Sequence, residues 1–190
     1  LDLQFADRKS LVDATTGSNL VTFTRASSGT YVGSDGLIKT AVTNLLLQSE
    51  DFSTTWAAQN IGAALAPVVT ANQATAPDGS DTADLVVFDL DGATVSGDRS
   101  QLTQAFGTAV VGLSYIFSVW IRTSDGTSKD LRFSFNGASA TNITVTTDWQ
   151  RLSVVLSSAA SANINPRISL RVGAGTSDYA SVYLWGAQLE

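Results

Sequence analysis

Residues 113–122 read LSYIFSVWIR, and the two-residue period of this stretch decides the fold class. The same alternation recurs in LRFSFN at 131–136, WQRLSVVL at 149–156 and RISLRV at 167–172. Turn-forming sequences such as TSDGTSKD separate these segments, and no stretch repeats apolar residues at helical spacing for three turns. The sequence therefore predicts an all-β protein built as an antiparallel β-sandwich.

The apolar positions of these strands predict the core. Eight of them are expected to be buried between the two sheets: Phe117, Val119, Phe133, Phe135, Leu152, Val154, Ile168 and Leu170. Trp149 and Trp185 are expected to pack in the core as well, because each ring offers a large apolar surface to bury.

The polar positions of the same strands carry arginine. The residues concerned are Arg122, Arg132, Arg151 and Arg171, and Trp120 lies on the same face as Arg122. If the strands are neighbours in one sheet, these five residues form a ligand-binding surface. Such a surface suits carboxylated or phosphorylated glycans, because arginine binds planar anions through paired hydrogen bonds and also stacks on rings. The alternative is that the arginines pair with aspartates across the sheet or at a subunit contact.

The N-terminal part of the chain has a different pattern. TYVGSDGLIKT at 30–40 predicts a hairpin, and 20–27 is compatible with a strand. We divide the chain into a connector, 1–42, and a sandwich, 43–190, in which the alanine-rich segment 57–76 is expected to be loop plus an edge strand. The connector has little core of its own, so it must dock on another surface. The chain begins at Leu1 and contains no methionine, which leads us to expect a piece of a longer product.

Composition excludes several classes of function. The 190 residues include no Cys and no His, so thiolate and imidazole chemistry, zinc sites and the usual serine triad are excluded. The net charge of −6 argues against nucleic acid as a partner, and no apolar run is long enough for membrane insertion. The charge is uneven, because residues 99–171 hold seven basic and three acidic side chains.

The carboxylates do not suggest a catalytic pair. Six of them stand in contexts typical of turns, where aspartate bonds to nearby backbone: Asp78, Asp81, Asp84, Asp89, Asp91 and Asp98. DLDG at 89–92 lacks the further spaced oxygen ligands of a calcium loop and is predicted to be a turn. We expect no catalytic residue, no metal ligand and no cofactor.

One long segment resembles a known family. FTRASSGTYVGSDGLIKTAVTNLLLQSEDFSTTW at 23–56 resembles a module of tailed-bacteriophage virion proteins. APDGSDTADLV at 76–86, YIFSVWIRTS at 115–124, TTDWQRLSV at 146–154 and VYLWGAQLE at 182–190 follow in the order found in carbohydrate-binding-module-like jelly rolls of tail-fibre and head-fibre proteins. The resemblance implies a jelly-roll sandwich on the exterior of a virion. Trp185 and Gly186 stand where many such modules have calcium-binding acids, so calcium is not expected.

Two functions follow from this resemblance. The first is a non-catalytic fibre, spike or decoration domain that binds host-surface or environmental glycans. The alternative is a purely structural capsid- or tail-decorating domain that oligomerises and has no glycan ligand. In both cases we expect a homo-oligomer, a trimer by analogy with phage fibres, and contacts with other virion proteins.

Overall fold

The computed structural model describes residues 30–32, 36–40, 43–135, 139–157 and 163–190, and the chain divides into two units, Leu1–Thr43 and Asn44–Glu190. In the first unit, β1 (Thr30–Val32) pairs antiparallel with β2 (Ile38–Thr40), which confirms the predicted hairpin. The expected strand at 20–27 lies outside the described residues. Within the described ranges there is no helix, and hence none that could span a membrane.

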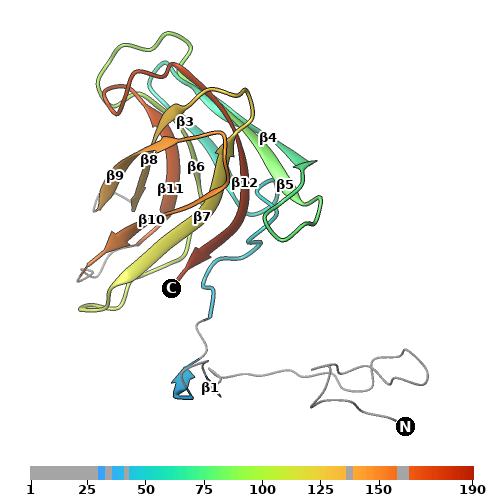
Figure 1. Ribbon diagram of the computed structural model, residues 1–190. Helices are drawn as coiled ribbons and strands as arrows, with labels where there is room; N and C mark the ends of the chain where they lie inside the picture. Colours follow the sequence, from blue (N-terminus) through green and yellow to red (C-terminus); the bar gives the residue numbers. More distant parts are fainter. Residues whose placement is uncertain (1–29, 33–35, 41–42, 136–138, 158–162) are drawn as a thin grey trace. The chain divides into compact units, whose positions relative to one another are not determined.

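The second unit is a sandwich of two five-stranded antiparallel sheets (Figure 1). The β12 sheet has the order β10-β7-β12-β5-β4, and the β11 sheet has the order β3-β6-β11-β8-β9. The ten strands are β3 (Ala57–Ile61), β4 (Leu65–Ala74), β5 (Ala83–Asp89), β6 (Arg99–Thr103), β7 (Tyr115–Thr123), β8 (Lys129–Phe135), β9 (Ala140–Val145), β10 (Gln150–Leu156), β11 (Pro166–Arg171) and β12 (Tyr179–Leu189).

The order of the strands makes the sandwich a jelly roll. Apart from the β4–β5 and β8–β9 hairpins, every connection between successive strands crosses from one sheet to the other. Except in these two hairpins, strands that follow one another in sequence therefore present their outward side chains on opposite faces of the sandwich. This consequence decides where the predicted arginines lie.

The buried side chains are largely those predicted from the alternation of apolar and polar residues along the strands. Of the eight side chains expected inside, seven are buried and Leu152 is half-buried at the edge strand β10. Phe117 on β7 and Phe133 on β8 meet across the two sheets with ring centroids 5.6 Å apart. Trp56 extends this aromatic cluster, with centroids 6.1 Å from Phe117 and 5.1 Å from Phe52. Trp149 and Trp185 are only half-buried and lie outside the core, so that prediction was wrong.

Two expectations about irregular segments need correction. The edge strand expected within 57–76 is confirmed, but the rest of the segment is a second edge strand and not a loop: β3 and β4 lie at the edges of opposite sheets. An edge strand tolerates Pro67, which has no N–H to donate. Asp84 lies inside β5 and is only 1% exposed, so it has no turn role.

Asp84 links three segments of the sandwich. Its Oδ2 accepts the N–H of Phe52 at 2.8 Å, and its Oδ1 accepts the N–H of Asn72 at 2.9 Å. Asn72 has a positive φ of 57°, which marks the irregular middle of β4. Burial raises the pKa of Asp84, and the two N–H groups act against that rise. The carboxylate therefore satisfies two backbone donors that would otherwise be left without an acceptor.

We expect Asp84→Asn to lower the free energy of unfolding by about 1–3 kcal/mol, because the amide NH₂ faces an N–H donor that then lacks an acceptor. Urea denaturation measures the change. Asp81→Asn, at an exposed aspartate, is the matched control and should change stability by less than about 0.5 kcal/mol. Equal effects of the two substitutions would contradict the assigned role.

Candidate functional site

Two rows of aromatic and cationic side chains cross the outer face of β10, β7 and β12. The antiparallel register aligns Arg151 on β10 with Trp120 on β7, and Trp120 with Trp185 on β12. In the neighbouring row, Tyr183 on β12 is aligned with Arg122 on β7. We call these side chains, together with Trp149 just before β10, the aromatic face; its members are Trp120, Arg122, Trp149, Arg151, Tyr183 and Trp185.

Arg122 is stacked between two rings. Its guanidinium carbon lies 5.2 Å from the ring centroid of Trp149 and 4.7 Å from that of Tyr183. The Nε of Arg122 is buried and has no hydrogen-bond partner. Stacking on the two rings is therefore the contact that positions this cation.

Arg151 is held in the second row by neutral partners. Its guanidinium carbon lies 5.9 Å from the Trp120 ring, and its Nη2 donates to Ser118 Oγ at 2.9 Å and to Gln188 Oε1. Its Nη1 donates to the carbonyl oxygen of Gly186 at 3.4 Å. No carboxylate partner offsets the charge of Arg151 within the described ranges, so its position is fixed while its charge remains available.

A β-bulge shapes this end of the face. The register between β12 and β7 shifts between Trp185 and Gln188, and Gly186 has a φ of +63°. A Cβ at this position would lie 3.4 Å from Trp120 Cδ1, and the left-handed backbone already favours glycine. The bulge turns the carbonyl oxygen of Gly186 towards Arg151.

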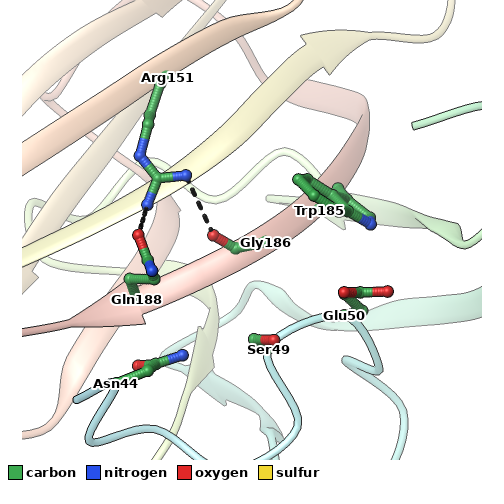
Figure 2. A pocket seen from close by; sticks show the side chains of 7 residues that line it. All are labelled: Asn44, Ser49, Glu50, Arg151, Trp185, Gly186 and Gln188. Atoms are coloured by element: carbon green, nitrogen blue, oxygen red, sulfur yellow. Dashed lines mark hydrogen bonds between the residues drawn. The ribbon is translucent and has the colours of Figure 1, made fainter. Parts of the chain in front are cut away.

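A pocket of about 370 Å³ opens beside the bulge (Figure 2). Figure 2 shows Arg151 and Gln188 on one side of it, Trp185 and Glu50 on another, and Ser49 and Asn44 along the facing segment. The lining thus combines an aromatic ring with a cation, a carboxylate, two amides and a hydroxyl group. Its volume is at the lower end of the range typical of small-molecule sites.

Residues 44–50 form one wall of the pocket because they are tied to the last strand. Asn44 donates from Nδ2 to the carbonyl oxygen of Ala187 at 2.8 Å and accepts the N–H of Leu189 at 3.0 Å. The N–H of Ala187 donates to the carbonyl oxygen of Ser49 at 2.8 Å. These bonds use the polar atoms of Asn44 but leave the Ser49 side chain directed at the pocket.

Trp185 and Glu50 are joined through one hydroxyl group. Trp185 Nε1 donates to Thr82 Oγ1 at 3.0 Å, and Thr82 Oγ1 lies 3.2 Å from Glu50 Oε2. The indole is therefore fixed at its edge, while Glu50 is exposed. A ring held in this way offers a flat, pre-organised surface to a ligand.

The predicted site residues divide between the two faces of the sandwich. Trp120, Arg122 and Arg151 come together on the β12 sheet, whereas Arg132 on β8 and Arg171 on β11 belong to the β11 sheet. The single surface that the sequence suggested is therefore not formed, because the connections between these strands cross the sandwich. On the β11 sheet, Arg132 and Arg171 are joined by two arginines that the sequence analysis did not single out, Arg99 and Arg167.

The alternation of side chains along the strands could have placed Trp149 and Trp185 on the outer face. Trp149 has the same parity as Arg151 and the opposite parity to Leu152, so the alternation that exposed Arg151 also placed Trp149 outward. Trp185 has the parity of Tyr183 and opposes Leu184. No sequence pattern indicated Glu50, which reaches the pocket only because residues 44–50 are tied to β12.

The described residues contain no group of three or more acidic side chains placed to hold a metal ion. The carboxylates that stand in turns instead bond locally, as Asp78 does with Ser80 and Asp125 with Thr127. These bonds lower the pKa of Asp78, and the pKa of Asp125 is lowered chiefly by Lys129.

No family model matches the sequence, and no curated protein is similar to it. Several solved structures are similar in fold. An exo-β-agarase has a TM-score of 0.52 and 9% identity, over 78% of this chain and 25% of that chain. The enzymatically active domain of bacteriophage CBA120 tailspike protein 4 has a TM-score of 0.49 and 12% identity, over 77% of this chain and 21% of that chain. A family 11 carbohydrate-binding module from Clostridium thermocellum, in complex with a β-1,3-1,4-mixed-linked tetrasaccharide, has a TM-score of 0.49 and 11% identity, over 72% of this chain and 88% of that chain.

These similarities concern the fold. The chain spans about a fifth of the tailspike chain and a quarter of the agarase chain, at identities far below those that carry function. The similarity to the agarase agrees with the fold described above. The function of this chain depends on its own side chains.

We expect Arg122→Ala to lower the free energy of unfolding by about 1–2 kcal/mol, because two half-buried rings lose the cation stacked between them. Denaturation followed by tryptophan fluorescence measures the change. Arg132→Ala removes the same charge from the opposite sheet, where Arg132 stacks on no ring of the described residues, and should cost less than half as much. A larger loss from Arg132→Ala would mean that stacking does not hold the aromatic face together.

Proposed function

We propose that the second unit is a non-catalytic glycan-binding domain whose site is the pocket beside Trp185. The observation that supports this most directly is the lining of that pocket, in which one fixed indole is combined with Arg151, Glu50 and Gln188. A sugar has apolar C–H faces and a rim of hydroxyl groups. An aromatic ring bordered by charged and amide groups matches both features.

The polar groups around the indole have complementary roles. Glu50 accepts hydrogen bonds from sugar hydroxyls, and the guanidinium of Arg151 donates to hydroxyl or ring oxygens. Because Arg151 is already fixed by Ser118, Gln188 and Gly186, binding costs little of its side-chain entropy. The site therefore recognises a sugar with a largely preformed surface.

The pocket does not favour hydrolysis. Canonical glycosidases place two carboxylic groups on either side of the scissile bond, whereas Glu50 is the one carboxylate among the described residues that line this pocket. Thr82 also engages Glu50 from the side. Binding without cleavage is the function that this lining supports best.

The resemblance of residues 23–56 to phage virion modules supports a wider setting for the domain. We propose that it lies on the exterior of a virion, as a fibre, spike or decoration domain that contacts other virion proteins, and that the full chain forms a homotrimer. The order of the downstream motifs supports the same setting. Light scattering on the full 190-residue chain tests the oligomer, and a monomer at high micromolar concentration counts against it.

An exposed apolar patch favours the structural alternative as a second candidate. Ile116 on β7 and Val155 on β10 are paired neighbours on the outer face, and both are exposed. Val110, Val111 and Leu113, in the loop that leads into β7, are exposed as well. Apolar surface of this kind is typical of a subunit contact, which would make the domain an assembly element without a glycan ligand.

We expect Trp185→Ala to weaken oligosaccharide binding at least about tenfold, roughly 1.4 kcal/mol, because the ring that stacks on the sugar is removed. Screening the wild type on a glycan array gives the ligand, and isothermal titration then measures the loss. Trp185→Phe keeps a stacking surface and should retain most of the affinity.

Val68→Ala is the matched control, since Val68 is an exposed residue on β4 of the same sheet and lies outside the pocket. This variant should bind like the wild type. Absence of any retained glycan, or affinity that survives Trp185→Ala in a folded protein, would refute the proposed site and leave the structural alternative.

A further inference from the structure

Four arginines lie on the outer face of the β11 sheet, opposite the aromatic face. Arg99 is on the strand β6, Arg167 and Arg171 are on β11, and Arg132 is on β8, and these three strands are hydrogen-bonded neighbours (Figure 1). All four alternate with the core side chains of their strands, which are Leu102, Leu131, Phe133, Ile168 and Leu170. We call this set the arginine face.

The register brings like charges together. Arg171 is aligned directly with Arg99, and Ser169, which follows Arg167 at the next outward position, is aligned with Arg132. Like charges opposite one another on a sheet are destabilising. Burial lowers the pKa of Arg99, and the charges of Arg171 and Arg132 lower it further. The pKa of Arg167 is lowered by burial and then by Arg99 and Arg171.

The bonds that orient these arginines come from neutral groups. Arg99 donates from Nε to Gln101 Oε1 at 2.6 Å and from Nη1 to the carbonyl oxygen of Gly97 at 3.2 Å. Arg132 donates from Nη1 to Asn142 Oδ1 at 3.5 Å. Within the part of the chain that the structure describes, Arg99, Arg132 and Arg171 form no ion pair with a carboxylate. The positive charges of Arg99, Arg132 and Arg171 are thus not neutralised by a carboxylate of the described residues.

The carboxylate within these three strands, that of Asp130, is already engaged. Asp130 on β8 accepts the hydroxyl of Thr144 at 3.0 Å and the N–H of Thr176 at 3.3 Å. Asp130 thus binds the edge strand β9 through Thr144 and the segment before β12 through Thr176. An acidic protein therefore gathers Arg99, Arg132 and Arg171 on one face without a carboxylate partner among the described residues, at a cost that an anionic ligand would offset.

We propose that the arginine face is a second binding surface, separate from the Trp185 pocket, and that it takes an anionic polysaccharide with a carboxylate or sulfate on successive sugars. Neighbouring strands are about 4.8 Å apart and outward residues on one strand about 7 Å apart, so the guanidinium groups recur at distances that suit such a chain. Each guanidinium can bind a planar carboxylate or a sulfate through two parallel N–H donors.

The side chains between the arginines favour a polysaccharide over a protein partner. The exposed ones are mainly amides, among them Gln59 and Asn142, and the buried Gln101 donates to Gln59 at 2.8 Å. Ile61, aligned with Arg99 at the edge strand β3, is an exposed aliphatic side chain beside them. Protein interfaces are usually centred on clusters of apolar and aromatic anchors, and the aliphatic Ile61 at the edge strand does not make such a cluster. A hydrated chain of sugars, rich in hydroxyl groups, fits a flat polar surface of this kind better.

Affinity chromatography and titration with two probes test the proposal, with polygalacturonate as the carboxylated polymer and heparin as the sulfated one. Neutral dextran is the comparison polymer. The wild type should bind at least one acidic probe, more weakly as salt rises from 50 to 200 mM. Arg132→Ala and Arg171→Ala should each weaken binding about tenfold. The stronger of the two probes identifies carboxylate or sulfate as the preferred anion.

Lys129→Ala is the matched control, because it removes one positive charge whose partner is Asp125 at 2.8 Å, and it should retain the affinity of the wild type. Trp185→Ala should also retain it, since the two surfaces lie on opposite sheets, so failure of the pocket and failure of the arginine face remain distinguishable. Circular dichroism checks that each variant is folded.

Four results would overturn the proposal. They are no binding to either acidic probe, equal binding by the wild type and both arginine variants, equally tight binding of duplex DNA, and a dimer of the wild type that Arg132→Ala dissociates. The last result would assign the face to an acidic surface of a second copy.

Discussion

Burial of an aromatic cluster between two sheets is the constraint on which the rest of the structure depends. Phe52, Trp56, Phe117 and Phe133 meet in the middle of the sandwich and fix which side of each strand faces inward. Because side chains alternate along a strand, every inward ring commits its neighbours to the outside. The two outer faces are consequences of the core, and their chemistry is set by the residues between the buried positions.

The two faces differ because the connections cross the sandwich. On the β12 sheet, cations and rings alternate and stabilise one another, and the bulge at Gly186 with the attached residues 44–50 adds a pocket at one end. On the β11 sheet, the cations have amide neighbours, and no ring of the described residues stacks on them. One surface therefore suits stacking on a sugar face, and the other suits an extended anion. A module with both could hold one polymer on either side.

Local sequence predicted much of this fold and less of the site. The period of residues 113–122 correctly placed Phe117 and Val119 inside and Arg122 outside, because that information lies within a single strand. It could not show that Arg132 and Arg122 lie on different sheets, since that depends on how the chain crosses between them. Trp149 was predicted to lie in the core because its ring is large. Its position in the alternation, which matches that of Arg151, would have placed it on the outer face. Glu50 depends on long-range bonds that no local pattern records.

The central claim is that one sandwich presents two independent binding surfaces, and nuclear magnetic resonance of side-chain N–H groups tests it most directly. Indole Nε1–H signals report Trp185 in the pocket and Trp56 in the core, while arginine Nε–H signals report Arg99 and Arg132. The account predicts that a neutral oligosaccharide shifts the Trp185 signal and leaves those of Arg99 and Arg132 unchanged, and that an acidic polymer does the reverse. Shifts of both sets by one ligand, or of the Trp56 signal by either, would contradict it.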